Sequence, residues 1–278
     1  MSMMLPGDFF DLSQCDYQEL FQPDEPVWTV LDRLHDYITS LFRGSWPLAG
    51  HTGMAERPLV IVNGEVRDDL VVRPLESGKS VRAFDGDSPL ENTAIIMPGA
   101  YLFDDRIIIG AGSVVEPGAL LKGPVVIGAR TEVRQGAYMR GDCLVGDGCV
   151  VGHTTEIKNS IMLDGAKAGH FAYIGDSILG RDVNLGAGTK LANLKMIPGE
   201  VMIAAERRFH RTGRRKLGAI LGDGTETGCN SVTAPGTLIR PRSVVYSGIS
   251  VPGGYYEEGS CLMPPSSSVA IGAIARRG

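Results

Sequence analysis

One histidine and three basic residues in the middle of this sequence are separated by multiples of 18 residues within two pairs. His170 follows Arg134 by 36 residues, and Lys158 follows Arg140 by 18. In a chain that coils with an 18-residue period, Arg134, Gly152 and His170 would stack along one edge, with Lys158 on the next edge. Imidazole titrates near neutral pH, and lysine and arginine bind phosphate groups. The set predicts a general base beside an anionic substrate, the alternative being that these are simply exposed polar residues.

A six-residue periodicity predicts the elements that position these side chains. Every sixth residue from Met97 to Leu163 is apolar, at twelve consecutive positions. A second, usually small residue follows each of these by four positions, as at Ala119, Cys143 and Cys149. Each hexapeptide is therefore expected to form a short flat strand and a corner, and three hexapeptides one triangular coil. The predicted fold class is all-β, a parallel β-helix.

The periodicity is interrupted once by a long basic segment. The six-residue spacing shifts after Leu163 and resumes as far as Leu191. It then holds at every sixth residue from Leu221 to Val251. The segment between holds six cations and one acid in residues 206–216, although the whole chain has a net charge of −5. We expect a loop of about 195–216 that leaves the solenoid and binds phosphate groups, and no general affinity for nucleic acid.

The sequence divides into three expected parts. Residues 1–90 are predicted to form an N-terminal cap, with one amphipathic helix at about 26–43 and a β hairpin around Asn63-Gly64. Residues 91–258 are predicted to form the β-helix, and 259–278 a C-terminal tail. Because repeat proteins need a covered end, we expect the cap to lie over the first coil.

Composition narrows the class of protein further. Hydrophobic residues make up 43% of the 278 positions, which excludes disorder and collagen, and the five cysteines lack the C-x-x-C spacing of a zinc site. Cys143 and Cys149 fall on small inward positions, so packed thiols are expected. Without a long apolar stretch or a signal-like start, the prediction is a cytoplasmic protein with no membrane partner.

Two segments carry a family resemblance. GPVVIGARTEVRQGAYMRGDCLVGDGCVVGHTTEIKNSIM and AKAGHFAYIGDSILGRDVNLGAGTKLANLK resemble the acetyltransferase domain of bifunctional sugar-1-phosphate nucleotidylyltransferases. The resemblance covers roughly residues 95–255 and implies a left-handed β-helix that assembles as a homotrimer. It also implies acetyl-CoA-dependent N-acetylation of an amino-sugar 1-phosphate, such as glucosamine 1-phosphate, in nucleotide-sugar biosynthesis, without a metal.

The resemblance assigns roles to individual residues. His170 in GHFAYIGD matches the catalytic base, and the backbone amide of Ala187 in the GAG turn matches the group that stabilises the oxyanion. Five residues match contacts to the sugar phosphate, namely Arg134, Lys158, Tyr173, Asn184 and Asn193. Cys229 lies where the family often has a serine that contacts the cofactor. The family's loop lysine has no clear match, so its role is assigned to Arg207, Arg208, Arg214 or Lys216.

The resemblance has a limit, and two alternatives stay open. Residues 1–90 contain no Gly-rich, Arg-containing nucleotide loop, so uridylyl transfer is not expected. A chain without catalysis could instead bind a sugar nucleotide or act as a scaffold. A metal enzyme of the γ carbonic anhydrase type could use His153 and His170, although no third ligand is evident among His35, His51 and His210.

Overall fold

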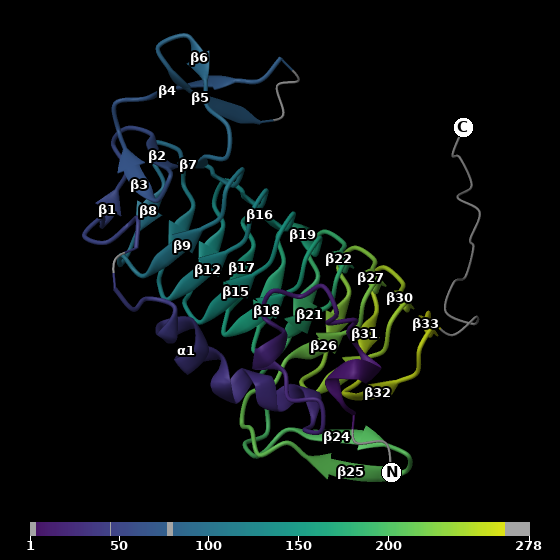
Figure 1. Ribbon diagram of the computed structural model, residues 1–278. Coiled ribbons are helices and arrows are strands. Elements are labelled where there is room, and N and C mark those ends of the chain that lie inside the picture. Colours follow the sequence, from purple (N-terminus) through teal and green to yellow (C-terminus); the bar gives the residue numbers. More distant parts are fainter. Residues whose placement is uncertain (1–3, 45, 77–79, 265–278) are drawn as a thin grey trace, which may run out of the picture.

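The protein folds as a left-handed parallel β-helix with three flat faces (Figure 1). The structure is a computed structural model that describes residues 4–44, 46–76 and 80–264. The chain crosses the first face, then the second, then the third, and begins the next coil. Each strand pairs in parallel with the strand one coil away, so successive coils stack at the ordinary strand spacing of ~4.8 Å.

The strands are short and fall into three ladders. The first face contains β7 (Ala94–Ile96), β10 (Val114–Val115), β13 (Glu132–Val133), β16 (Val150–His153), β19 (Lys167–His170), β22 (Asn184–Leu185), β27 (Glu226–Thr227), β30 (Val244–Val245) and β33 (Cys261–Leu262). The second face contains β8 (Tyr101–Leu102), β11 (Leu120–Leu121), β14 (Tyr138–Met139), β17 (Glu156–Lys158), β20 (Tyr173–Gly175), β23 (Lys190–Leu191), β28 (Val232–Thr233) and β31 (Ser250–Val251). The third face contains β9 (Ile107–Ile109), β12 (Val125–Ile127), β15 (Cys143–Val145), β18 (Ser160–Met162), β21 (Ile178–Leu179), β26 (Ala219–Leu221), β29 (Thr237–Ile239) and β32 (Gly254–Tyr256).

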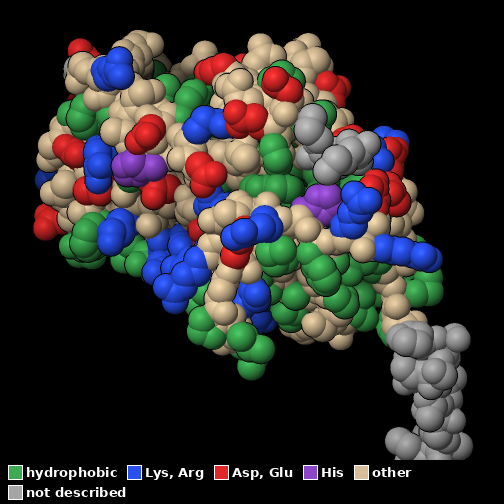
Figure 2. Space-filling view, turned by 90° about the horizontal axis from the view of Figure 1, so that it is seen from below, with side chains coloured by type: hydrophobic (Ala, Val, Ile, Leu, Met, Phe, Trp, Pro, Cys, Tyr) green, Lys and Arg blue, Asp and Glu red, His purple; other side chains and the backbone are tan. Residues whose placement is uncertain are grey.

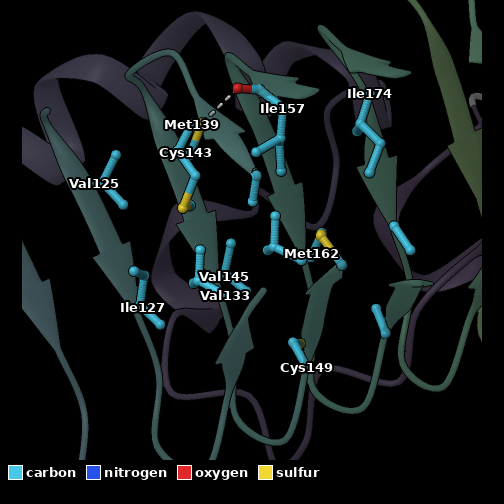
Figure 3. Packing of buried hydrophobic residues seen from close by; sticks show 14 of the residues in the cluster. Val125, Ile127, Val133, Met139, Cys143, Val145, Cys149, Ile157, Met162 and Ile174 are labelled. Carbon is cyan, nitrogen blue, oxygen red and sulfur yellow. Dashed lines mark hydrogen bonds between the residues drawn. The ribbon is translucent and has the colours of Figure 1, made fainter. Parts of the chain in front are cut away.

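The interior confirms most of the six-residue pattern. Every sixth residue from Ile109 to Ile157 is buried, and so are the small residues between them (Figure 3). Cys143 and Cys149 lie in this core, and burial raises the pKa of each thiol to about 12. The Cys143 thiol donates a hydrogen bond to the Ile157 carbonyl at 3.5 Å. Both cysteines therefore act as small apolar residues with a weak donor, as predicted.

The ends of the predicted pattern are wrong by one residue. Phe103 is 56% exposed, and Leu102 fills the core position instead, because an extra residue precedes β9. Leu163 is buried, but it packs on the outside of the third face, while Met162 points inward.

A shortened corner explains the shift at Met162. Tyr138 pairs with Glu156, 18 residues on, whereas Cys143 pairs with Ser160, only 17 residues on. Asn159 and then Asp176 turn this corner with left-handed backbone angles of φ 41° and 47°. As a consequence His170 pairs with His153, not with Gly152, and the predicted column of Arg134, Gly152 and His170 is wrong.

The N-terminal helix lies along the solenoid instead of covering its end. Three 3-10 turns, η1 (Pro6–Asp8), η2 (Gln18–Leu20) and η3 (Val27–Thr29), lead into α1 (Val30–Ser40), which is shorter than the expected 26–43. The helix buries Leu31, Leu34 and Ile38 against the third face (Figure 1). This face attracts the helix because its central outward residues are apolar in coil after coil, namely Val126, Leu144, Ile161, Ile178, Ile220 and Leu238.

Antiparallel strands cover the first coil. β1 (Gly53–Met54) pairs with β8, and β2 (Leu59–Val62) pairs with β7. The expected hairpin around Asn63-Gly64 is present, because β2 continues into β3 (Glu65–Arg67). β4 (Val71–Pro74), β5 (Val81–Asp85) and β6 (Ser88–Pro89) form a separate antiparallel sheet beside this end. These strands, and not the helix, protect the edge of the first coil.

The other end of the solenoid runs past the expected boundary. Cys261 in β33 still pairs with Val244 in β30, so the ladder continues beyond residue 258. Most of the expected C-terminal tail, residues 265–278, lies outside the described residues.

Candidate functional site

The predicted site residues occupy two different corners of the prism. The corner between the first and second faces carries His153, His170, Ala187 and Cys229 on four successive coils, and we call it the histidine corner. The corner between the second and third faces carries Arg140, Lys158, Asp176 and Asn193, and we call it the lysine corner. Within one chain the second face lies between these two groups.

His170 presents an imidazole to solvent at the end of β19. Its side chain is exposed, and it makes no hydrogen bond or ion pair to other protein groups in the described part of the chain. The ring of Phe171 lies 6.2 Å from the His170 ring, centroid to centroid. One coil below, His153 Nδ1 donates to the Gln135 carbonyl at 2.9 Å, because a carbonyl oxygen can only accept. Of the two stacked histidines, His170 is therefore the one with both ring nitrogens available.

The GAG turn places Ala187 directly beside His170 in the next coil. The Ala187 carbonyl accepts the Asn230 amide at 2.8 Å, whereas its own N–H has no protein partner among the residues described. Gly186 is required by the stacking itself, since a Cβ there would lie 2.5 Å from the Thr227 carbonyl oxygen. Cys229, one coil further on, is exposed. The corner thus combines a free imidazole with a free backbone donor.

The lysine corner is organised around a buried carboxylate. Asp176 is 4% exposed, and its oxygens accept hydrogen bonds from Lys158 Nζ at 3.2 Å and from Asn159 Nδ2 at 2.7 Å. The Asn193 Nδ2 donates to the same carboxylate. Arg140 stacks one coil below Lys158 and pairs with Glu156 at 2.6 Å. Asp176 was not among the site residues predicted from the sequence, although it is the last residue of the GHFAYIGD motif.

Tyr173 extends from the second face toward the lysine corner. Its hydroxyl donates to Asn193 Oδ1 at 3.3 Å, and Asn193 is 8% exposed. Asn184 lies on the exposed outer side of the first face, just before the histidine corner. The structure therefore brings Lys158, Tyr173 and Asn193 together and leaves Asn184 on the histidine side.

Arg134 does not accompany Lys158. It lies at the histidine corner, two coils below the level of His170, and pairs with Glu132 at 2.8 Å. The residue that shares the corner with Lys158 is Arg140. The 18-residue spacing predicted this stacking of Arg140 on Lys158, and the assignment of Arg134 to the sugar phosphate stays a prediction.

The expected basic loop is a β hairpin, which we call the arm (residues 192–217). β24 (Met202–Ala205) pairs with β25 (Arg208–Arg211) and packs beside β32 and the outside of the third face. Its buried apolar residues are Val201, Ile203, Ala205 and Leu217. Figure 2 shows the face that bears the arm, with Lys and Arg side chains interspersed among hydrophobic ones. The segment is thus anchored by apolar packing and not held only by a ligand.

The arm cations differ in their surroundings. Arg214 pairs with Asp32 of α1, and its side chain is only 13% exposed, which opposes the predicted role in binding the cofactor. Arg211 pairs with Glu200 at 2.8 Å. Arg207 and Arg208 are exposed at the turn of the hairpin, and Lys216 is exposed at its base. Of the four cations assigned to the cofactor, Arg207, Arg208 and Lys216 are therefore exposed and Arg214 is not.

The described residues give no direct support to the metal alternative. His153 and His170 are strand partners, as their spacing allows, but among residues 4–44, 46–76 and 80–264 no three His, Cys, Asp or Glu side chains gather around one point. In the same ranges, no helix is long and apolar enough to span a bilayer.

Known proteins match the central part of the chain. The GMPPB C-terminal domain matches residues 121–212. A bifunctional sugar-1-phosphate nucleotidylyltransferase/acetyltransferase of Sulfurisphaera tokodaii is 40% identical over 36% of this chain and 25% of its own length. Bifunctional GlmU proteins of Methanococcus maripaludis and Synechococcus are 39% and 32% identical over 34% and 46% of this chain.

The solenoid resembles the C-terminal part of these bifunctional enzymes. The family resemblance expected from the sequence is thereby confirmed for this stretch. The chain spans about a quarter of the length of these relatives, namely 25%, 23% and 22%. A solved acetyltransferase domain of PglB from Neisseria gonorrhoeae aligns with 59% of this chain and 56% of its own, at 16% identity and a TM-score of 0.18, a likeness too weak to support an argument.

Proposed function

We propose that this protein transfers the acetyl group of acetyl-CoA to the amino group of an amino-sugar 1-phosphate. The observation that carries the proposal is the histidine corner, where the free imidazole of His170 lies beside the free backbone amide of Ala187. A general base and a fixed oxyanion donor are the two groups that acyl transfer to an amine requires. The acetyltransferase activity named for the relative from Sulfurisphaera tokodaii supports the same chemistry.

The reaction assigns one role to each group. The sugar nitrogen attacks the thioester carbonyl carbon, His170 accepts the proton that the nitrogen loses, and the new C–N bond forms. The Ala187 N–H stabilises the negative oxygen of the tetrahedral intermediate. When the C–S bond breaks, the proton passes to the departing thiolate of coenzyme A, so that an amide and a free thiol result.

The lysine corner suits the phosphate and the sugar. Lys158 and Arg140 present two cations from stacked coils, and Tyr173 and Asn193 supply polar atoms beside them. Asn184 would contact the acetyl end from the histidine side. Arg207, Arg208 and Lys216 of the arm are exposed cations suited to the phosphates of coenzyme A, and Cys229 lies at the histidine corner.

The separation of the two corners supports a homotrimeric enzyme. In one chain the second face lies between His170 and Lys158, so a small substrate cannot easily contact both. If the histidine corner of one chain meets the lysine corner of a neighbour, both groups face one cleft. Each cleft would then contain residues from two chains, and the trimer would contain three such sites.

A substrate screen tests the proposal. The chain is incubated with acetyl-CoA and with glucosamine 1-phosphate or galactosamine 1-phosphate, and the free thiol of coenzyme A is followed. Release with one of these sugars and none with N-acetylglucosamine 1-phosphate, whose amine is blocked, is the expected result. Binding of a sugar phosphate without thiol release would favour the binding or scaffold alternative.

A further inference from the structure

The lysine corner contains a chain of hydrogen bonds whose direction is fixed. Lys158 and Asn159 donate to the buried Asp176 carboxylate, at 3.2 and 2.7 Å. The Asn193 amide donates to the same carboxylate, and the Tyr173 hydroxyl donates to Asn193 at 3.3 Å. An ionised carboxylate accepts hydrogen bonds but cannot donate them. The charge of Asp176 therefore determines which way the Asn193 amide is turned.

The orientation of Asn193 in turn determines what Tyr173 can offer to a ligand. With its NH2 group toward Asp176, Asn193 presents Oδ1 toward Tyr173, and the single phenolic proton is used in that bond. The Tyr173 oxygen is left with its lone pairs and acts toward a ligand as an acceptor. Tyr173 is partly exposed, so this acceptor lies within reach of solvent.

We propose that Asp176 is a positioning residue that makes Tyr173 a hydrogen-bond acceptor and so selects a sugar with a donor at that point. The inference deepens the proposed function and rests on it. A hydroxyl or an amine N–H of the amino-sugar phosphate is the donor that Tyr173 would accept. Asp176 itself is buried beneath Lys158 and Asn193 and does not contact the substrate.

The variant Asp176→Asn tests this role with little change of shape. Asparagine is isosteric with aspartate and tolerates the left-handed backbone found at this corner, as Asn159 does one coil below at φ 41°. The amide side chain introduced at position 176 can offer either its NH2 group or its oxygen to Asn193. It therefore no longer forces the Asn193 amide into one orientation. We expect the KM for glucosamine 1-phosphate to rise about fivefold to tenfold, with a smaller change in kcat. This is the size of effect expected when one hydrogen bond, here between Tyr173 and the sugar, is weakened.

A matched control is available two coils below. Asp142 turns the same corner with a left-handed φ of 52°, but its carboxylate binds His35 of α1 at 2.6 Å and forms no hydrogen bond or ion pair with the described site residues. Asp142→Asn removes an equivalent corner charge. Its KM should equal that of the wild type. Equal increases of KM in both variants would show that Asp176 has only a structural role.

A double-mutant cycle separates this inference from the proposed function. If Asp176 acts through Tyr173, then Tyr173→Phe should raise the KM severalfold in the wild-type background. In the Asp176→Asn background the same substitution should raise the KM by less than twofold. Two independent sites would instead give the same factor in both backgrounds. An unchanged KM in Asp176→Asn, or equal factors in both backgrounds, would overturn the role of Asp176 while wild-type turnover still supports the function. A wild-type chain that acetylates no amino-sugar phosphate would overturn the function and this inference with it.

Discussion

At the scale of single residues, the proposed reaction depends most on His170. Because the side chain is exposed and lacks internal partners in the described region, His170→Ala should leave the free energy of unfolding nearly unchanged. Loss of a general base should lower kcat by about 10²- to 10⁴-fold. Stopped assays of coenzyme A release, together with thermal unfolding of the same samples, provide both values.

The control for this variant is another exposed histidine. His35 lies on α1 and pairs with Asp142, away from the histidine corner. His35→Ala should retain wild-type turnover. If His170→Ala were as active as His35→Ala, the imidazole of His170 would have no part in the reaction.

The buried thiols predict how stability depends on pH. The pKa values of Cys143 and Cys149 are about 12 in the folded chain, raised by burial from an ordinary 9.0. Above pH 9 the unfolded chain loses these protons while the folded chain keeps them, so the stabilising contribution is complete below pH 9 and is lost between pH 9 and 12. The loss is at most ~1.4 kcal/mol per thiol for each pH unit.

Alanine substitutions isolate this effect from other alkaline groups. The variant Cys143→Ala with Cys149→Ala should lose less stability than the wild type between pH 8 and pH 10 in urea unfolding. Alanine already fills the corresponding small position at Ala119 and Ala137, so the variant should fold. Parallel pH curves for the two proteins would contradict burial of these thiols.

At the scale of elements, the arm is held by packing. Ile203 in β24 is fully buried against the third face, whereas Ile197 in the same arm is 78% exposed. Ile203→Ala should lower the free energy of unfolding by about 2–4 kcal/mol, and Ile197→Ala by less than about 0.5 kcal/mol. Chemical unfolding of both variants measures the difference. A similar small effect for both would mean that the arm is not anchored as described.

The elements also show where sequence-based prediction works and where it stops. Core positions from Ile109 to Ile157 could be predicted because burial repeats every six residues. The one-residue shortening at Asn159 could not, because Met162 and Leu163 are both apolar and either fits the pattern. The helix was predicted but its place was not, although the 18-residue recurrence of Val126 and Leu144 on the outside of the third face was a readable signal.

Some features of the candidate site could likewise be predicted from the sequence, and others could not. Motifs identify His170, Lys158 and Tyr173, because local sequence around a corner is distinctive. The stacking of Arg140 on Lys158 could be predicted from their 18-residue spacing, whereas the stacking of His170 on His153 could not, because it depends on the shortened corner. The role of Asp176 could not be predicted from the sequence, because it depends on three donors that come from the coil before it, Lys158 and Asn159, and from the coil after it, Asn193.

At the scale of the whole molecule, the separation of the two corners predicts an oligomer. Light scattering at micromolar concentration should give three times the 29.7 kDa mass of the chain. Mixing two inactive proteins, His170→Ala and Lys158→Ala, should then restore part of the activity, because some clefts receive an intact histidine corner from one chain and an intact lysine corner from the other. A monomeric mass with full activity would contradict a shared site.

The proposed reaction of the whole molecule is acetyl transfer to the nitrogen of an amino-sugar 1-phosphate. The most direct measurement incubates the wild-type chain with acetyl-CoA labelled with ¹³C in the acetyl group and with glucosamine 1-phosphate or galactosamine 1-phosphate, and follows the label by NMR. We expect the label to appear in an amide on the sugar nitrogen of one of these substrates, at the same rate as coenzyme A is released. Label that remains in the thioester with both sugars, or appears as an ester on a sugar oxygen, would contradict it.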